Sequence, residues 1–556
     1  MEDIMKKLSL IIILVLCSIA LFAQNVDWFW AKQAGGINDD RGYSIAVDDN
    51  GNSYITGDFK EGATFGTTTL TSSGDSDIFV AKLNSNGNWL WAKQAGGTSY
   101  DYSHSIAVDA NGNSYVTGYF EGSANFGTTT LTSSGYIDIF VAKLDSNGNW
   151  LWAKQAGGIN DDYGYSIAVD AYGNSYVTGF FEGSATFGAT NLTSSGDFDI
   201  FVAKLDINEN WLWAKQAGGT IYDYGLSIAV DDNGNSYVTG DFYSSSCSFG
   251  TTTLTSSGVD DIFVAKIDYN GNWLWAKQAG GTGLDFGSSI TVDDNGNSYV
   301  TGYFSYSATF GTTTLTSSGV DDIFVAKLNS SGNWLWAKKA GGTSYDEGYS
   351  ITVDANGYSY ITGEFDGSAT FGTTTLTSSG SLDIFVAKID HNGNWLWAKR
   401  AGGSYVDFCY SIAVDANGNS YVTGRFSGCA TFGATTLTSS GVYEYDIFVA
   451  KVGEVNSINL PDIISFNGIR SIYPNPFNPL TTIDYEISMP ADVKIEVYNN
   501  RGQLVRNFIL GYKEQGSYKL TWEGEDNNGC LCSTGIYYIR MQAGKEIYIK
   551  KAVLLK

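Results

Sequence analysis

The chain has 556 residues, a formal net charge of −26 and a sequence pI near 4.3. This acidity excludes a nucleic-acid backbone as the partner, because phosphate recognition needs a basic stripe that the sequence lacks. Gly (67), Trp (15) and Tyr (36) are abundant and Pro (5) is rare, a mixture typical of glycine-turned, aromatic-filled β-structure.

The N-terminus has the features of a secretory signal. Two lysines precede an apolar run at residues 8–22, and Ala23-Gln24 follows as a cleavage point. No later stretch is long and apolar enough to cross a membrane as a helix. We therefore expect residues 1–24 to be a signal peptide, and the protein to be exported without a membrane span.

A tryptophan segment, WLWAKQAGG in its commonest form, recurs seven times from residue 28 onward. Successive copies are 61 residues apart, with one spacing of 62, so insertions are nearly absent. Such a fixed period is the signature of a repeat architecture. The anchors are Trp30, Trp91, Trp152, Trp213, Trp275, Trp336 and Trp397.

One repeat unit predicts four antiparallel strands, a to d. Residues 105–109 and 114–120 flank one Asn-Gly turn, and residues 138–144 and 149–155 flank another. Asn-Gly between apolar runs is the strongest short hairpin signal. Strands c and d are almost continuously apolar, which indicates burial on both faces. Neighbouring copies must therefore sandwich each sheet, as in a β-propeller of seven blades.

The two ends of the array complete one another. The first tryptophan segment, residues 25–36, has no strand c before it, whereas the last strand c, residues 446–451, has no tryptophan segment after it. A linear solenoid would instead need polar capping units at both ends. We predict that residues 25–452 form a closed ring, in which the N-terminal strand completes the last blade.

The chain after the ring has a different composition, because all 5 prolines lie there. Residues 453–470 are expected to be a linker, and residues 471–556 a small all-β domain. Alternating apolar patterns place the strands of this domain at residues 481–487, 493–498, 516–522, 535–542 and 545–554.

Two resemblances carry further expectations. The core GG…D…SIAVDxxGNSYVTG resembles the bacterial SBBP-type repeat, which implies a β-propeller. The tail motifs YPNPFNP, VYN and STGIYY resemble the type A sorting domain of the type IX secretion system. That resemblance implies an immunoglobulin-like β-sandwich, passage across the outer membrane with the type IX machinery as partner, and a secreted or cell-surface location.

Residues that carry catalysis or bind metal are scarce. His104 and His391 are the only histidines, and we expect both on solvated loops, without a catalytic triad or metal site. The repeated D-x-N-G-N pattern favours a hairpin turn over a calcium loop, because no distal Glu follows. We expect no catalytic residue, metal or cofactor. Cys409 and Cys429 flank paired strands, so a disulfide between them is feasible.

One aspartate recurs between strand d and the next strand a. Seven such carboxylates near the axis are candidate ligands for a cation or polar molecule, and the alternative is a turn in which each caps its own backbone. The ring also has three arginines, Arg41, Arg400 and Arg425, for which we favour drift over a carboxylate clamp. The aspartates are Asp40, Asp101, Asp162, Asp223, Asp285, Asp346 and Asp407.

Variation among the repeats points to one binding face. The a–b and c–d turns are nearly constant, whereas the d–a and b–c connections on the opposite face differ between blades and are rich in Tyr, Asp, Ser and Gly. We expect a glycan or protein ligand there, contacting Tyr102, Tyr163, Tyr224 and the seven aspartates. The predicted function is a secreted or cell-surface binding protein, and the alternative is a glycan-active enzyme with its site at the channel mouth.

Overall fold

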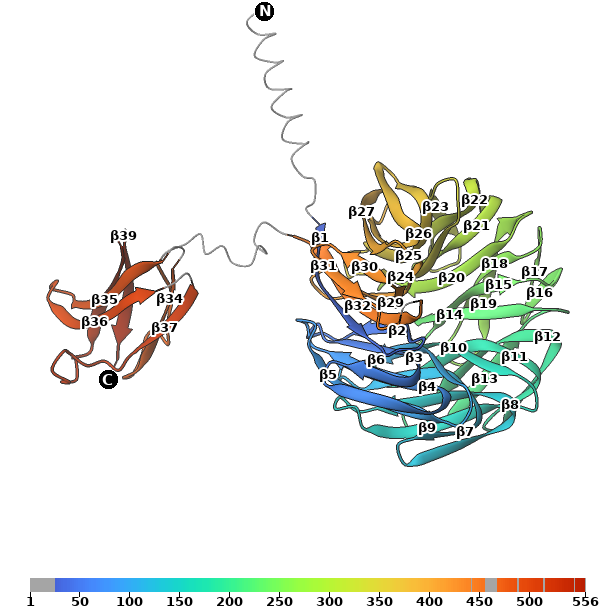
Figure 1. Cartoon of the computed structure of the whole chain (residues 1–556), viewed down its shortest axis with the longest axis horizontal. Coiled ribbons are helices and arrows are strands. Elements are labelled where there is room, and N and C mark those ends of the chain that lie inside the picture. Colours follow the sequence, from blue (N-terminus) through green and yellow to red (C-terminus); the bar gives the residue numbers. More distant parts are fainter. Residues whose placement is uncertain are drawn as a thin grey trace, which may run out of the picture. The chain divides into compact units, whose positions relative to one another are not determined.

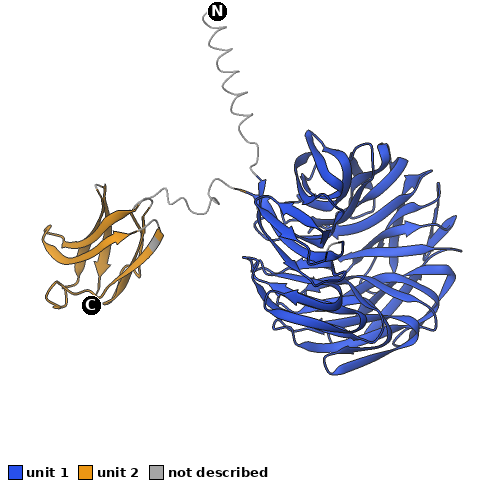
Figure 2. Ribbon diagram, viewed as in Figure 1, with its two compact units in different colours: residues 1–454 blue, residues 455–556 orange. Residues whose placement is uncertain are grey.

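The computed structural model describes residues 26–441, 443–455, 468–487, 490–513, 516–544 and 546–555. The chain divides into two compact units, residues 1–454 and 455–556 (Figure 2). The described residues form strands and turns without a helix, and so no helix among them is able to span a membrane. The expected signal peptide, residues 1–24, lies outside the described residues.

The first unit is a seven-bladed β-propeller whose blades follow chain order (Figure 1). The first four blades have the following strands. They are β2 (Arg41–Val47), β3 (Ser53–Phe65), β4 (Thr68–Leu83) and β5 (Trp89–Gly97); β6 (Asp101–Val108), β7 (Ser114–Phe126), β8 (Thr129–Leu144) and β9 (Trp150–Gly158); β10 (Asp162–Val169), β11 (Ser175–Phe187), β12 (Thr190–Leu205) and β13 (Trp211–Ala217); and β14 (Asp223–Val230), β15 (Ser236–Phe242), β16 (Ser246–Phe249), β17 (Thr252–Thr255), β18 (Asp261–Ile267) and β19 (Trp273–Gly281).

Blades 5 to 7 repeat the same order from strand a to strand d. Their strands are β20 (Asp285–Val292), β21 (Ser298–Phe310), β22 (Thr313–Leu328) and β23 (Trp334–Ala340); β24 (Asp346–Val353), β25 (Ser359–Phe371), β26 (Thr374–Ile389) and β27 (Trp395–Gly403); and β28 (Asp407–Val414), β29 (Ser420–Ser427), β30 (Cys429–Phe432), β31 (Thr435–Thr438), β32 (Tyr445–Glu454) and β1 (Val26–Ala34).

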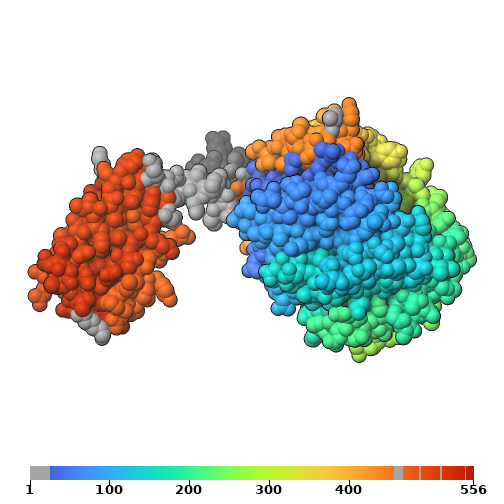
Figure 3. Space-filling model, turned by 60° about the horizontal axis from the view of Figure 1, so that its bottom comes forward, coloured from blue at the N-terminus to red at the C-terminus, as the bar shows by residue number. Residues whose placement is uncertain are grey.

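The predicted closure is confirmed. β1 pairs antiparallel with β32, from Val26 opposite Glu454 to Ala34 opposite Ile447, and completes the sheet β1-β32-β29-β28. Figure 3 shows the blue surface of the first blade against the orange surface of the last. Trp28 of β1 is 8% exposed and packs edge-on against Phe432 of blade 7 at 5.1 Å. The N-terminal strand therefore supplies core as well as backbone pairing.

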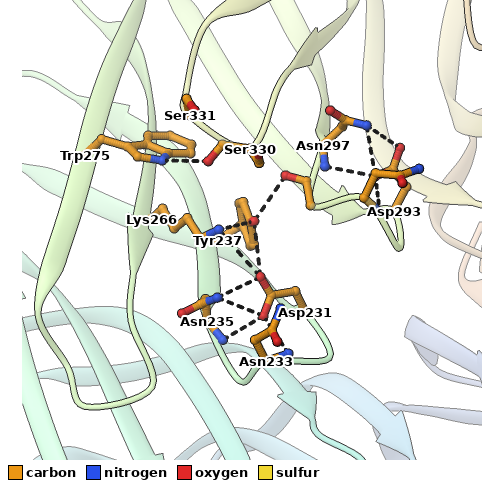
Figure 4. A network of polar contacts seen from close by, with 12 residues as sticks. Asp231, Asn233, Asn235, Tyr237, Lys266, Trp275, Asp293, Asn297, Ser330 and Ser331 are labelled. Carbon is orange, nitrogen blue, oxygen red and sulfur yellow. Dashed lines mark hydrogen bonds and ion pairs between the residues drawn. The ribbon is translucent and has the colours of Figure 1, made fainter.

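Lateral contacts hold neighbouring blades together at the tight-turn end (Figure 4). The Asp231 carboxylate accepts hydrogen bonds from the turn amides of Asn233 and Asn235, as the turn interpretation of D-x-N-G-N predicts. The Tyr237 hydroxyl lies 3.3 Å from Asp231 Oδ2 and 3.1 Å from the Gly296 carbonyl of the next blade. Equivalent tyrosines, fully buried, occur in every blade.

The b–c connection is a hairpin arm, which the sequence did not predict. In blade 2 the arm joins β7 to β8, and its residue Ala124 pairs with Gly97 of β5 in the preceding blade. A Cβ at Gly97 would lie 1.8 Å from the Ser123 carbonyl oxygen, so the repeated Gly-Gly is required by this crossing.

The second unit is the predicted immunoglobulin-like β-sandwich. One sheet has the order β33-β34-β37 and the other β36-β35-β38-β39, with Trp522 and Phe477 in the core between them. Two strands, β33 and β36, were not predicted. The strands are β33 (Gly468–Tyr473), β34 (Thr481–Ile487), β35 (Ala491–Asn499), β36 (Leu504–Lys513), β37 (Gly516–Trp522), β38 (Gly535–Ala543) and β39 (Glu546–Leu554).

The feasible disulfide between Cys409 and Cys429 does not form. Cys409 is buried and its thiol points to the Thr423 carbonyl at 3.7 Å, whereas Cys429 is exposed and lies beside Thr438. Cys409 lies on β28, which pairs with β29, whereas Cys429 lies on β30, which pairs with β31 and β27. None of the five described cysteines forms a disulfide.

Candidate functional site

Strand a, the strand of each blade that lines the channel, has a β-bulge at the same position in all seven blades. In blade 2 the pairing register shifts between Ser103 and Ser105, which turns both His104 and Ser105 toward the channel. A Cβ at Gly118 on the opposite strand would lie 1.9 Å from the Tyr102 carbonyl oxygen. The Thr-Gly of each repeat therefore permits the bulge. The bulged residues are Tyr43, His104, Tyr165, Leu226, Ser288, Tyr349 and Tyr410.

A closed ring of seven serines follows the bulges. Each serine Oγ accepts a hydrogen bond from the isoleucine amide of the next blade, at 3.1–3.2 Å, as Ile106 N donates to Ser44. The bond from Ile45 to Ser411 joins the first blade to the last. The ring therefore makes the channel wall uniform. Its members are Ser44, Ser105, Ser166, Ser227, Ser289, Ser350 and Ser411.

Both rings line a channel cavity of about 370 Å³. His104 stacks on Tyr165 at 4.8 Å and lies 5.1 Å from Tyr43, so it belongs to the channel wall and not to a solvated loop as expected. Burial lowers the pKa of His104 to about 4, which keeps the imidazole neutral. His391 lies on an exposed turn.

The channel mouth, in contrast, differs in every blade. The second residue of each strand a lies opposite a residue of strand b, and no two of the seven resulting pairs have the same residues in the same order. They are Arg41–Asp58, Tyr102–Tyr119, Tyr163–Phe180, Tyr224–Asp241, Phe286–Tyr303, Glu347–Glu364 and Phe408–Arg425, where the blade 1 pair begins at the first residue of β2. This mouth is defined by these fourteen residues.

The predicted tyrosines Tyr102, Tyr163 and Tyr224 are half-buried members of this mouth. Tyr102 packs on Tyr119 at 5.2 Å, and Tyr119 meets Tyr163 of the next blade edge-on at 4.9 Å. Blades 2 to 4 therefore present a continuous arc of aromatic rings. The spacing of strand a was sufficient to find these positions in the sequence.

Two of the three arginines also reach the mouth, although drift was favoured for them. The Arg425 guanidinium lies 4.4 Å from the Phe408 ring centroid and 4.2 Å from that of Tyr445. Arg41 pairs with Asp39 at 3.2 Å and approaches Asp58 at 4.0 Å. Arg400 lies elsewhere and pairs with Asp383 at 2.8 Å.

Blade 6 places two carboxyl groups opposite one another. Glu347 accepts a hydrogen bond from the Tyr349 hydroxyl at 2.7 Å, and Glu364 is 4% exposed. Burial and the neighbouring Glu347 raise the pKa of Glu364 to about 8, and burial raises that of Glu347. At neutral pH this pair therefore holds a proton.

The expected ring of ligand-binding aspartates is corrected by the structure. The seven side chains are 0% exposed, and Oδ2 of each accepts a hydrogen bond from the second glycine of Gly-Gly at 2.6–2.8 Å. They cap the d–a turn and lie below the mouth surface. These residues are Asp40, Asp101, Asp162, Asp223, Asp285, Asp346 and Asp407.

Each turn aspartate shares its site with a second buried carboxyl group from strand c. Asp101 and Asp77 both border the point where a Cβ of Gly96 would stand, at 3.0 and 2.7 Å. Burial and the nearby Asp77 raise the pKa of Asp101 to about 8, although the Gly97 amide opposes this. The described residues contain no group of three or more His, Cys, Asp or Glu able to hold a metal ion.

Stretches of both units match known protein families. Seven stretches match the family described as beta-propeller repeat (SBBP), and residues 479–546 match the FlgD Ig-like domain. Each matched stretch runs from strand d of one blade through strand a into strand b of the next. They are residues 30–58, 90–119, 151–179, 212–241, 274–303, 335–364 and 396–425.

Curated relatives are distant and longer. An uncharacterized WD repeat-containing protein of Acanthamoeba polyphaga mimivirus is 24% identical over 503 residues, covering 72% of this chain and 36% of that protein. The regulatory protein FlaEY of Caulobacter vibrioides is 25% identical over 432 residues, covering 72% and 41%. The chain thus spans roughly two fifths of their length or less.

The similar solved structures have low TM-scores. A fungal alcohol oxidase of the AA5 family in complex with copper has a TM-score of 0.42 at 13% identity, covering 96% of this chain and all (100%) of that one. PorZ, a surface component of the type IX secretion system of Porphyromonas gingivalis, has a TM-score of 0.21 at 12% identity, covering 95% and 100%. Likenesses at these scores carry no information on function.

Proposed function

We propose that this chain is an exported binding protein that takes an extracellular glycan or protein ligand at its channel mouth. One observation carries the proposal. The serine ring repeats without change in seven blades, whereas the seven residue pairs around it all differ. A rigid scaffold with one variable rim is the arrangement in which loops and strand ends usually carry binding.

The residue types at the mouth also support a binding function. Tyr102, Tyr163 and Tyr224 give rigid, amphipathic contact area, and tyrosine loses little conformational entropy on binding. Arg425 is held in place by aromatic rings and keeps its guanidinium edge for a partner. Contacts from several blades would combine into one epitope.

Export through the tail is the second part of the proposal. The motif YPNPFNP and the sandwich fold of residues 468–555 support a sorting-domain role, and the signal-like residues 1–24 support entry into the periplasm. In the structure, Asn475 of the motif accepts a hydrogen bond from Val553 N and so fastens the last strand. The proposed role of this domain is to direct the protein through the type IX secretion machinery to the cell surface or the medium.

A deletion of residues 471–556 tests this part. The shortened protein should accumulate in the periplasm of a host with type IX secretion, whereas the full chain reaches the surface. The matched control is Asn475→Ala in the full chain, which loosens the last strand and should reduce delivery less severely. Normal surface delivery of the deletion would exclude a sorting role.

A glycan-active enzyme remains the second candidate because of Glu347 and Glu364. A carboxyl pair with raised pKa values is able to act as a general acid in glycoside hydrolysis. Glu364→Gln should then abolish hydrolysis of the bound glycan and leave its binding intact. Unchanged turnover in this variant would exclude the pair from catalysis.

A further inference from the structure

Blade 4 is one of two blades, with blade 7, in which the long strands of the arm are interrupted. The only 62-residue spacing lies between Trp213 and Trp275, and the additional residue falls between Phe242 and Phe249. As a result β15 ends at Phe242 and the arm restarts at β16, whereas the equivalent strands of blades 1, 2, 3, 5 and 6 continue into their arms. Tyr243 directly follows β15 and occupies the position that Glu121 has in blade 2, where the equivalent backbone hydrogen bond forms.

Three tyrosines form a box at this position. Tyr222 and Tyr224 stack with ring centroids 6.2 Å apart and planes at 9°, and Tyr243 stands perpendicular to both at 6.3 Å. The Tyr243 amide donates to the Tyr222 carbonyl at 2.9 Å, which fixes the box through the backbone. Tyr222 is 40% exposed and forms its outer wall.

Two buried carboxyl groups border the same box. Asp241 lies opposite Tyr224 in the strand register and is 1% exposed, and Asp260 precedes β18 and is 0% exposed. Neither carboxyl oxygen of Asp241 has a hydrogen-bond partner, whereas Asp260 interacts with the Tyr243 hydroxyl of the box. Burial and the neighbouring Asp260 raise the pKa of Asp241 well above its usual value, and burial raises that of Asp260 to about 7. An unpartnered buried carboxyl group is unfavourable, so Asp241 lacks a partner that a ligand would supply.

We propose that the box of Tyr222, Tyr224, Tyr243, Asp241 and Asp260 binds a protonated primary amine of the ligand. This inference rests on the proposed binding function and names the ligand's chemistry. An ammonium group supplies three hydrogen-bond donors for the carboxyl oxygens and a positive charge for the faces of the tyrosine rings. The net charge of −26 also steers cations toward this surface.

Blade 2 provides an internal control. Tyr100 and Tyr102 stack as Tyr222 and Tyr224 do, with centroids 6.2 Å apart and planes at 8°. At the positions of Asp241 and Asp260, however, blade 2 has Tyr119 and Ile137. Blade 2 thus has the rings without the carboxyl groups, and it should not bind an amine.

Titration of the full chain with small probes tests the box directly. At about pH 8, where butylamine is still protonated, n-butylammonium should bind at least about tenfold more tightly than n-butyltrimethylammonium, which has no donors, or than neutral 1-pentanol. Asp241→Asn, Asp260→Asn and Tyr222→Ala should each weaken butylammonium binding by about tenfold or more. Tyr100→Ala in blade 2 should leave it unchanged. Equal binding of the neutral probe, or unchanged binding in Asp241→Asn, would overturn the proposal.

The amine has two natural sources, a lysine side chain and an amino sugar. Trilysine and a glucosamine trimer should each bind more tightly than their N-acetylated counterparts, and the tighter of the two identifies the source. If both acetylated compounds bind as well as the free amines, the proposal is wrong. If the full chain binds extracellular ligands that butylammonium does not displace, the amine box fails while the binding function stands.

Discussion

The indole Nε1 of Trp397 donates to the Glu454 carboxylate at 3.4 Å, at the one junction where strand c of the next blade does not turn into strand d. At five other junctions the same tryptophan position donates to a turn carbonyl of the next blade, as Trp91 does to Ser146 at 3.2 Å. Glu454 also accepts from Lys388 at 2.8 Å. A side chain at the end of β32 therefore replaces the missing turn and stabilises the seam.

Glu454→Gln should weaken this seam. Lys388, whose side chain is 9% exposed, would lose its charged partner, and we expect a loss of about 1–3 kcal/mol in the free energy of unfolding. Chemical denaturation measures the change. The control is Glu209→Gln, which breaks the more exposed pair with Lys154 and should cost about 0–1 kcal/mol. Equal effects of both substitutions would contradict the seam's special role.

Closure of the ring by β1 predicts a large effect at Trp28. Trp28→Ala removes a buried indole packed on Phe432 and should cost about 3–5 kcal/mol of unfolding free energy. Leu90→Ala is the matched control, because Leu90 lies in the equivalent strand of blade 1 and is 52% exposed. An unchanged denaturation midpoint for Trp28→Ala would contradict closure by the N-terminal strand.

The serine ring predicts that loss of a single serine hydroxyl lowers the free energy of unfolding. Ser105→Ala leaves the Ile167 amide without its acceptor in a packed junction, which should cost about 1–3 kcal/mol. Ser330→Ala, on an exposed turn, should be neutral within experimental error. The ring would have no stabilising role if the two variants had the same unfolding free energy.

Much of the ring followed from the sequence because its signals are local. The tryptophan spacing and the Asn-Gly turns predicted the four strands and the closure, both of which are confirmed. The bulges, the hairpin arms and the wall position of His104 depend on how separate strands meet. The Ser- and Thr-rich arm has weak alternation, and nothing near His104 indicates that it faces a channel.

The site was predicted in part for the same reason. Tyr102, Tyr163 and Tyr224 follow from strand position, whereas the turn role of the seven aspartates required the hydrogen bonds of Gly-Gly to be seen. The amine box combines Tyr222, Asp241 and Asp260, which are close only after strands a, b and c have paired.

The paired buried carboxyl groups predict that stability depends on pH. Burial raises the pKa of Asp101 and Asp162 to about 8 and that of Asp407 to about 7, above the unfolded value of 3.8. Their stabilising contribution is complete below 3.8 and is lost as pH rises through 7 to 8, so the melting temperature should fall from about pH 5 to about pH 9.

His104 has the opposite effect on the pH dependence of stability, because burial lowers its pKa to about 4. It is a single group, whereas the carboxyl groups with raised pKa values are several. Asp101→Asn mimics the protonated acid and should reduce the slope of melting temperature against pH. A melting temperature that rises between pH 5 and 9 would contradict protonated carboxyl pairs.

Binding at the channel mouth is the central claim, and one comparison tests it most directly. The full chain and two variants are measured against a panel of extracellular glycans and surface proteins, with melting curves to verify folding. Tyr102→Ala/Tyr163→Ala/Tyr224→Ala should lose at least about tenfold in affinity for the ligand that the unmodified chain binds, whereas Asn111→Ala/Asn147→Ala, on the tight-turn face, should bind normally. Loss of binding in the asparagine variant with full binding in the tyrosine variant would contradict the account.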